Sequence, residues 1–189
     1  WYVSQADVEM VMFNIGDVHD VNADQTTAFT TIFWNQFNAQ RGYNSFNLAL
    51  AQYLEKALDD NGKFQEFKEY VKSKGYDWER NISRFAAGRL DLALQMAKEV
   101  DPTLSTDVIR TRILNNEVNV SVEAFAAEMK EFIENKHNRN FRILFFVDEV
   151  SQFIGEHRDL LLQLQSLVKR LDEVCESRCW IACTAQQTL

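Results

Sequence analysis

Arg142-Ile143-Leu144-Phe145-Phe146-Val147-Asp148-Glu149 is the stretch that decides the fold, because five apolar residues run directly into two adjacent carboxylates. A short apolar run of this kind is typical of a parallel strand that is buried on both faces of its sheet. In open α/β sheets, ligands bind at the carboxyl ends of such strands. We therefore expect a strand over residues 142–147, with Asp148 and Glu149 at the edge of the sheet where ligands bind.

A second strand-like run, Trp180-Ile181-Ala182-Cys183, follows further along the chain and ends in Thr184-Ala185-Gln186-Gln187. Between the two runs, residues 159–175 carry leucines and valines at helical spacing, which predicts an amphipathic helix. Strand, helix and strand in this order form a right-handed parallel βαβ unit. The apolar run from Val8 to Ile15 is predicted to be a third strand of the same sheet.

Most of residues 22–140 is predicted to be helical, because apolar residues recur there every three or four positions. One helix is expected after Asp24, which can cap it, and a second from Phe46, whose ring begins its apolar stripe. A third is expected up to Val71, and a fourth runs unbroken from Trp78 to Ala97. Two more are expected over 103–116, with Val108 facing inward, and from 121.

The chain is thus predicted to be α/β, with about three parallel strands and a large helical insertion. We expect three parts: a first strand and loop (1–21), the insertion (22–140), and a final strand–helix–strand segment (141–189).

Charge and cysteine content narrow the class of protein. The formal net charge of −8 over 189 residues argues against this chain gripping a nucleic-acid backbone alone, so DNA contact is expected only indirectly or through a larger parent. No apolar run approaches the ~18 residues of a membrane span, and no membrane partner is expected. Cys175, Cys179 and Cys183 are predicted to be reduced core thiols, which favours a cytoplasmic location.

Asp148 and Glu149 match the Walker B pattern, in which an apolar strand ends in Asp-Glu. In phosphate-loop ATPases the Asp holds the nucleotide-bound Mg²⁺, usually through water. A Glu beside it can orient and deprotonate the hydrolytic water. We therefore predict a Mg²⁺-binding role for Asp148 and a catalytic role for Glu149. The alternative is that a buried strand simply ends in charged surface residues.

Thr184 and Gln186 follow the neighbouring strand, where this class of ATPase carries a polar sensor of the γ-phosphate. We predict that Gln186 or Thr184 is that sensor; ordinary polarity at a strand end is the alternative. No G-x-x-x-x-G-K-[ST] phosphate loop occurs among the six glycines. The sequence therefore predicts a partial P-loop NTPase sheet of the AAA+/ASCE type. We expect ATP and Mg²⁺ to bind in a complete parent protein, whereas this chain alone is expected to be inactive and to bind no nucleotide tightly.

A third cluster of polar residues, Asp17, His19 and Asp20, follows the first predicted strand. Its D-x-H-D spacing can bind a metal, but no fourth ligand is evident in the sequence. Solvated loop residues are the favoured interpretation.

Several segments together resemble BrxC/PglY-like proteins, the large P-loop ATPases of the BREX phage-defence systems. The similar segments are Phe29–Asn38, Arg41-Gly42-Tyr43, Gly75–Glu79, Phe145–Gly155 and Thr184–Gln187. They span nearly the whole chain but only a small part of such a protein. The resemblance implies an internal fragment, without the Walker A loop, of an ATPase whose partners are other defence-system proteins. It also implies that Asp148 and Glu149 carry the Walker B roles and Gln186 or Thr184 the sensor role.

A hypothesis from another class is a non-catalytic helical module for protein interaction, in which the nucleotide site is degenerate. Residues 24–135 would then form the docking surface, and no step would depend on nucleotide. Either way, without a phosphate-loop strand beside it the strand over 180–183 should form an exposed apolar sheet edge. Such edges recruit other strands, so we expect self-association through this edge or its coverage by another segment.

Overall fold

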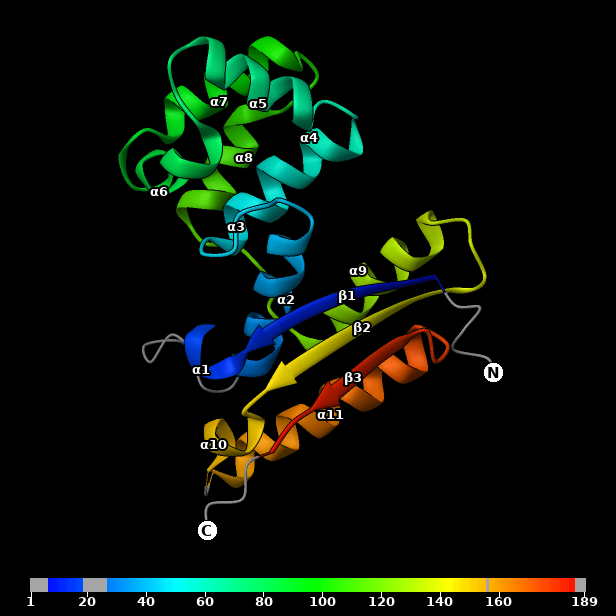
Figure 1. The fold of residues 1–189 in the computed structure, drawn as a ribbon. Coiled ribbons are helices and arrows are strands. Elements are labelled where there is room, and N and C mark those ends of the chain that lie inside the picture. The colour runs from blue at the N-terminus through cyan, green and yellow to red at the C-terminus, as the bar shows by residue number, and fades with distance from the viewer. Residues whose placement is uncertain (1–6, 19–26, 156, 186–189) are drawn as a thin grey trace. The chain divides into compact units, whose positions relative to one another are not determined.

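The computed structural model describes residues 7–18, 27–155 and 157–185 (Figure 1). The chain divides into two compact units. The sheet unit comprises residues 1–37 and 119–189, and the helical unit comprises residues 38–118. Both boundaries fall inside the stretch 22–140 that we expected to be a single insertion, because most of its first described helix and all of its last one belong to the sheet unit.

The sheet unit is built on three parallel strands in the order β1-β2-β3. These are β1 (Asp7–Asn14), β2 (Phe141–Asp148) and β3 (Cys179–Cys183). The register places Asn14 opposite Asp148 and Val147 opposite Cys183, so the carboxyl ends of all three strands lie at one edge. Two helices, α10 (Val150–Ile154) and α11 (Arg158–Val174), connect β2 to β3. The predicted α/β class and the three-stranded parallel sheet are confirmed.

One face of this sheet is covered by helices α2 (Ala28–Gln40), α9 (Val122–Asn135) and α11, of which α9 and α11 lie on the same side in Figure 1. The Phe33 ring lies 5.5 Å from that of Phe13 on β1 and 5.0 Å from that of Phe145 on β2, measured between centroids. These rings, with Ile143 and Val147, are buried and form the core of the unit. Aromatic side chains dominate because each buries a large apolar area on a flat sheet.

The opposite face is only partly covered, which corrects the expectation that the 142–147 strand is buried on both faces. Leu144 and Phe146 on β2 are half-buried. Their register neighbours Met10 and Met12 on β1 are 44% and 66% exposed. The apolar run of β2 therefore alternates between a buried face and a half-buried face of the sheet. The hydrophobicity of the run alone could not distinguish these two faces.

The longest described helix of the sheet unit, α11, is amphipathic as predicted. Leu160, Leu167 and Leu171 are buried, whereas Leu162 and Val168 are 56% and 42% exposed. No helix within the described part of the chain is both long and apolar enough to cross a membrane.

The helical unit has its own core, centred on Leu54, Phe67, Trp78 and Phe85. Its helices are α3 (Leu48–Leu50), the π-helical turn η3 (Ala51–Glu55), α4 (Lys56–Asp60), α5 (Phe64–Ser73), α6 (Trp78–Gly88), α7 (Leu90–Val100) and α8 (Thr106–Leu114). The first three elements form one continuous helix, which confirms the helix expected from Phe46, although it begins at Leu48. A short four-residue helix, α1 (Ile15–Val18), follows β1 in the sheet unit.

Three sequence expectations in the helical unit were wrong. The helix predicted over 78–97 breaks at Arg89, whose φ of −135° and ψ of 28° are not helical, and continues as α7. Gly88 precedes the break, and the conformational freedom of glycine makes it unfavourable inside a helix. Phe46 is 86% exposed and Val108 is 50% exposed, so neither belongs to the core. The predicted cap Asp24 lies outside the described residues.

Candidate functional site at the carboxyl edge of the sheet

Polar side chains from all three strands meet at the carboxyl edge of the sheet. Asn14 ends β1, Asp148 ends β2, and Thr184 follows β3 directly. The backbone N–H of Thr184 donates to the Val147 carbonyl at 3.0 Å, which extends the β2–β3 ladder by one residue and brings the hydroxyl to the carboxylate of β2. The two predicted residues Asp148 and Thr184, distant in sequence, are thus brought together.

The Asp148 carboxylate is bound from two directions. The Thr184 hydroxyl donates to Asp148 Oδ1. The backbone N–H of Glu149 lies 2.9 Å from the same oxygen and 3.2 Å from Thr184 Oγ1, so it is shared between them. Among the described residues, all hydrogen bonds to this carboxylate end on Oδ1. The exposed Asp148 side chain therefore retains Oδ2 as an acceptor for a cation or for a water bound to one.

Glu149 is held in an unusual backbone conformation. Its φ of 59° and ψ of 27° lie in the left-handed region, immediately before α10 begins. A non-glycine residue there carries a conformational cost, and such residues cluster at functional sites. The turn redirects the chain between Asp148 and Val150, so the Asp148 and Glu149 side chains leave the strand end in different directions.

The Glu149 carboxylate is fixed by Asn14, which the sequence analysis did not identify. Asn14 Nδ2 donates to Glu149 Oε2 at 2.7 Å. Asn14 Oδ1 accepts from the Gly16 backbone N–H at 2.8 Å, which settles the orientation of the amide, because its nitrogen must then face the carboxylate. A Cβ at Gly16 would lie 3.3 Å from Asn14 Oδ1, so a glycine there leaves room for this contact.

A sequence signal for Asn14 existed. It is the single polar residue at the carboxyl end of the otherwise apolar run Met10–Ile15. Polar residues at this point of a parallel strand face the ligand edge, which is the argument that selected Asp148 and Thr184. The strand was expected to end at Ile15, which placed Asn14 inside the strand and not at its carboxyl end. Its position at the ligand edge was therefore missed.

Other predicted site residues are not placed. Gln186, the second candidate sensor, lies outside the described residues, as do His19 and Asp20. Asp17 is described, and it is an exposed residue of α1. Within the described residues, no group of three or more His, Cys, Asp or Glu side chains is arranged to hold a metal ion.

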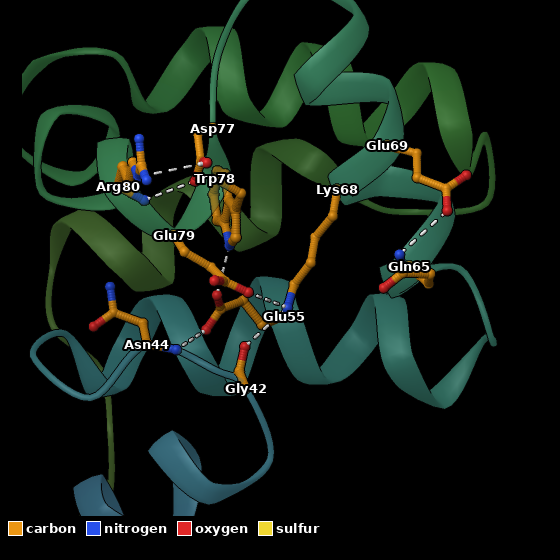
Figure 2. Close-up of polar contacts among 10 residues, drawn as sticks. All are labelled: Gly42, Asn44, Glu55, Gln65, Lys68, Glu69, Asp77, Trp78, Glu79 and Arg80. Carbon is orange, nitrogen blue, oxygen red and sulfur yellow. Dashed lines mark hydrogen bonds and ion pairs between the residues drawn. The ribbon is translucent and has the colours of Figure 1, made fainter.

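A second polar cluster surrounds Glu55 in the helical unit (Figure 2). Glu55 is completely buried at the end of the π-helical turn. Its Oε2 accepts from the Asn44 backbone N–H at 2.6 Å, and its Oε1 accepts from Trp78 Nε1 at 2.7 Å. Burial raises the pKa of Glu55 to about 6, although both hydrogen bonds and the nearby cations Lys68 and Arg41 oppose the rise.

Glu55 is best explained as a brace, because its two hydrogen bonds connect separate segments. Through Asn44 it holds the loop between α2 and α3, and through Trp78 it holds the first residue of α6. Lys68 supports the same loop from α5, since its Nζ donates to the Gly42 carbonyl at 3.2 Å and pairs with Glu79 at 3.1 Å. A buried carboxylate without such partners would be strongly destabilising.

The three cysteines occupy different environments. Cys175 and Cys179 are buried, as predicted, whereas Cys183 is exposed at the end of β3, which the prediction of a core thiol missed. The hydrogen bond with Cys179 lowers the pKa of Cys175 and raises that of Cys179. The backbone N–H of Arg178 donates to the Cys175 carbonyl at 3.0 Å, which joins the end of α11 to the start of β3.

No protein-family model matches the chain, and no solved structure gives a significant match to it. The chain's own residues and the arrangement of its strand ends therefore indicate its function.

Proposed function

We propose that this chain supplies the hydrolytic half of the ATP site of a P-loop ATPase. The observation that carries the proposal is that Asp148, Glu149 and Thr184 meet at the carboxyl edge of a parallel sheet, on neighbouring strands. In this role Asp148 holds Mg²⁺ through water, Glu149 activates the hydrolytic water, and Thr184 or Gln186 senses the γ-phosphate.

The order of the strands supports the same proposal. In this class of ATPase the Walker B strand and the sensor strand are neighbours, and the strand that carries the phosphate loop lies beyond the sensor strand. Here β2 and β3 are neighbours, and β3 is at the end of the described sheet. ATP and Mg²⁺ are therefore the proposed cofactors of a complete domain, in which a phosphate-loop strand would lie beside β3.

The resemblance to BrxC/PglY-like proteins extends the proposal to a biological setting. We propose that the parent ATPase belongs to a phage-defence complex of the BREX type, with other defence proteins as its partners and with DNA reached only through the complex. The net charge of −8 fits this indirect role, because a surface that binds phosphate backbones requires clustered Lys and Arg.

The test is magnesium-dependent ATP hydrolysis by a longer natural protein that contains this sequence together with a phosphate loop. Glu149→Gln should retain ATP binding and reduce turnover at least about 100-fold, because the water loses its general base. Asp148→Asn should weaken the dependence on magnesium. Glu134→Gln, an exposed carboxylate on α9, is the matched control and should leave turnover unchanged. Hydrolysis at the wild-type rate in Glu149→Gln would exclude the Walker B assignment.

One observation favours the alternative of a protein-interaction module. Phe46 is 86% exposed, and its loop is rigidly held, since Asn44 Oδ1 accepts from the backbone N–H groups of Phe46 at 2.6 Å and Asn47 at 2.8 Å. An aromatic ring presented in this way can anchor a partner. The two candidates differ in nucleotide dependence: a docking module binds its partner equally well with and without ATP.

A further inference from the structure

The outer edge of β3 has a defined set of backbone groups available for pairing. β3 ends the described sheet, and its inner edge bonds to β2 through the Arg178 carbonyl and the Thr184 N–H, each at 3.0 Å. Because the two edges of a strand alternate residue by residue, the N–H and C=O groups of Cys179, Ile181 and Cys183 point outward. An edge of this kind is a template for another strand.

A groove of about 620 Å³ runs between this edge and α11. Leu164, Val168, Lys169 and Asp172 line it from the helix, and Trp180 and Ile181 line it from the strand. Val168 is 42% exposed, although it projects from a helix that packs on the sheet. An apolar floor beside a free backbone edge fits an extended strand with apolar side chains.

The geometry of α11 and β3 indicates which strand fits best. The backbone N–H of Arg178 donates to the Cys175 carbonyl at 3.0 Å, so the end of the helix lies beside the start of the strand. Ile181 lies two residues along β3, about 6.6 Å at a strand rise of ~3.3 Å per residue. The same distance along a helix, at ~1.5 Å per residue, corresponds to about four residues back from Cys175. The centre of β3 therefore lies level with the point on α11 midway between Lys169 and Asp172.

We propose that the groove is the docking site of a second copy of this chain, related by a two-fold axis through Ile181. The two β3 strands then pair antiparallel, with Cys179 opposite Cys183 of the partner subunit, and form a continuous six-stranded sheet. The two α11 helices run antiparallel across the same axis. Lys169 faces Asp172 of the partner subunit, and the reverse pair follows from the symmetry.

Charge complementarity selects this occupant. The groove carries one cation and one anion, placed on either side of the two-fold axis, so the surface is complementary to itself. Within one copy Lys169 Nζ lies 3.9 Å from Glu173 Oε1, and Asp172 Oδ1 accepts from Ser177 Oγ at 2.8 Å. A symmetric dimer adds an opposite charge from the partner subunit to each, pairs the outward backbone groups of both edges and covers Val168 in each copy. The formal net charge of −8 per copy opposes association at long range, but salt at about 0.15 M screens it beyond ~8 Å.

The test is the dimer dissociation constant of the 189-residue chain, measured by sedimentation at about 0.15 M salt. Lys169→Asp alone places Asp against Asp172 at both symmetry-related contacts, and Asp172→Lys alone places Lys against Lys169. Each variant should weaken the dimer about tenfold or more. An equimolar mixture of the two restores opposite charges at both contacts and should recover wild-type affinity as a heterodimer.

Two control variants test whether the loss of affinity is specific to the charges of the groove. Lys72→Asp and Glu69→Lys make the same charge changes at exposed positions of α5 in the helical unit and should leave the dissociation constant unchanged. A wild-type chain that stays monomeric at about 100 μM, well above typical dimer constants, overturns the proposal. A dimer that both variants weaken but their mixture does not restore overturns the two-fold register. In a complete ATPase domain the proposed phosphate-loop strand would occupy this same edge in place of the second copy. The dimer is therefore tested on the 189-residue chain, and ATP hydrolysis is tested separately on the longer protein.

Discussion

Asn14 Nδ2 lies 2.7 Å from Glu149 Oε2, although the two residues are 135 positions apart in the sequence. The parallel register of β1 and β2 brings them together, because it places Asn14 opposite Asp148, the residue before Glu149. The contact links the ends of two strands through side chains alone. It holds the carboxylate that we propose as the general base in one position and lowers its freedom to swing toward a nucleotide.

Asn14→Ala should therefore destabilise the chain by about 1–2 kcal/mol, since a partly buried hydrogen bond to a charged group is lost. The measurement is urea-induced unfolding at pH 7. Asn119→Ala is the matched control, because Asn119 is exposed in a loop, and it should change the free energy of unfolding by less than about 0.5 kcal/mol. Equal effects from the two variants would show that the Asn14 contact contributes nothing in solution.

The left-handed backbone of Glu149 gives a second prediction, which separates conformation from side-chain contacts. Glu149→Ala and Glu149→Gly both remove the carboxylate and its bond to Asn14. Only glycine adopts φ near 59° without cost, so Glu149→Gly should be more stable than Glu149→Ala by about 1 kcal/mol. At Glu131, in the middle of α9, the same pair of substitutions should show the opposite order. An alanine variant at position 149 as stable as the glycine variant would contradict the left-handed assignment.

The strand–helix–strand segment was predictable because its signals are local. The apolar run before Asp148, the amphipathic residues of α11 and the run at Trp180 each indicate their own element, and the connection then requires parallel strands. The same reasoning placed Asp148 and Thr184 at the ends of neighbouring strands, whereas the hydrogen bond between them appears only in the structure. Asn14 was missed because its role depends on where β1 ends, and strand boundaries are poorly marked in sequence.

The helical unit was less predictable, because apolar spacing does not show which residues a core can reach. Phe46 and Leu50 share one apolar stripe in the sequence, yet Leu50 is fully buried and Phe46 is 86% exposed. The Asn44 side chain forms a turn with the backbone N–H groups of Phe46 and Asn47. Asn47 then caps the helix, because its Oδ1 accepts from the Leu50 backbone N–H at 2.9 Å. The helix therefore starts after Phe46 and leaves its ring outside.

This difference predicts contrasting effects of two phenylalanine substitutions. Phe46→Ala should change the free energy of unfolding by less than about 0.5 kcal/mol, because the ring is already exposed. Phe67→Ala should cost about 3–5 kcal/mol, because Phe67 is fully buried against Trp78, with ring centroids 4.8 Å apart. Thermal or urea unfolding measures both. A large loss in Phe46→Ala would mean that the ring is covered in solution, for instance by a partner surface.

Glu55 gives a prediction about pH. Its pKa is raised to about 6 by burial, above the ordinary value of 4.5, so the folded chain binds this proton more tightly than the unfolded chain does. Stability from this group is therefore full below pH 4.5 and declines as the pH rises through 6. At about 1.36 kcal/mol for each pKa unit, the decline is about 2 kcal/mol. The chain carries 28 Asp and Glu residues in all, so the effect of Glu55 must be isolated by a variant.

Glu55→Gln provides that isolation, because glutamine has the shape of the protonated acid and does not titrate. Below pH 4.5 the wild type should be at least as stable as the variant. Between pH 4.5 and 7 the difference, wild type minus Glu55→Gln, should fall by about 2 kcal/mol, as only the wild type acquires a buried charge. Urea unfolding across this pH range measures it. Glu69→Gln, at an exposed position on α5, is the matched control for the removal of one carboxylate. A constant difference for Glu55→Gln would mean that the folded protein gives this carboxylate enough hydrogen bonds and positive charge to cancel the cost of burying it.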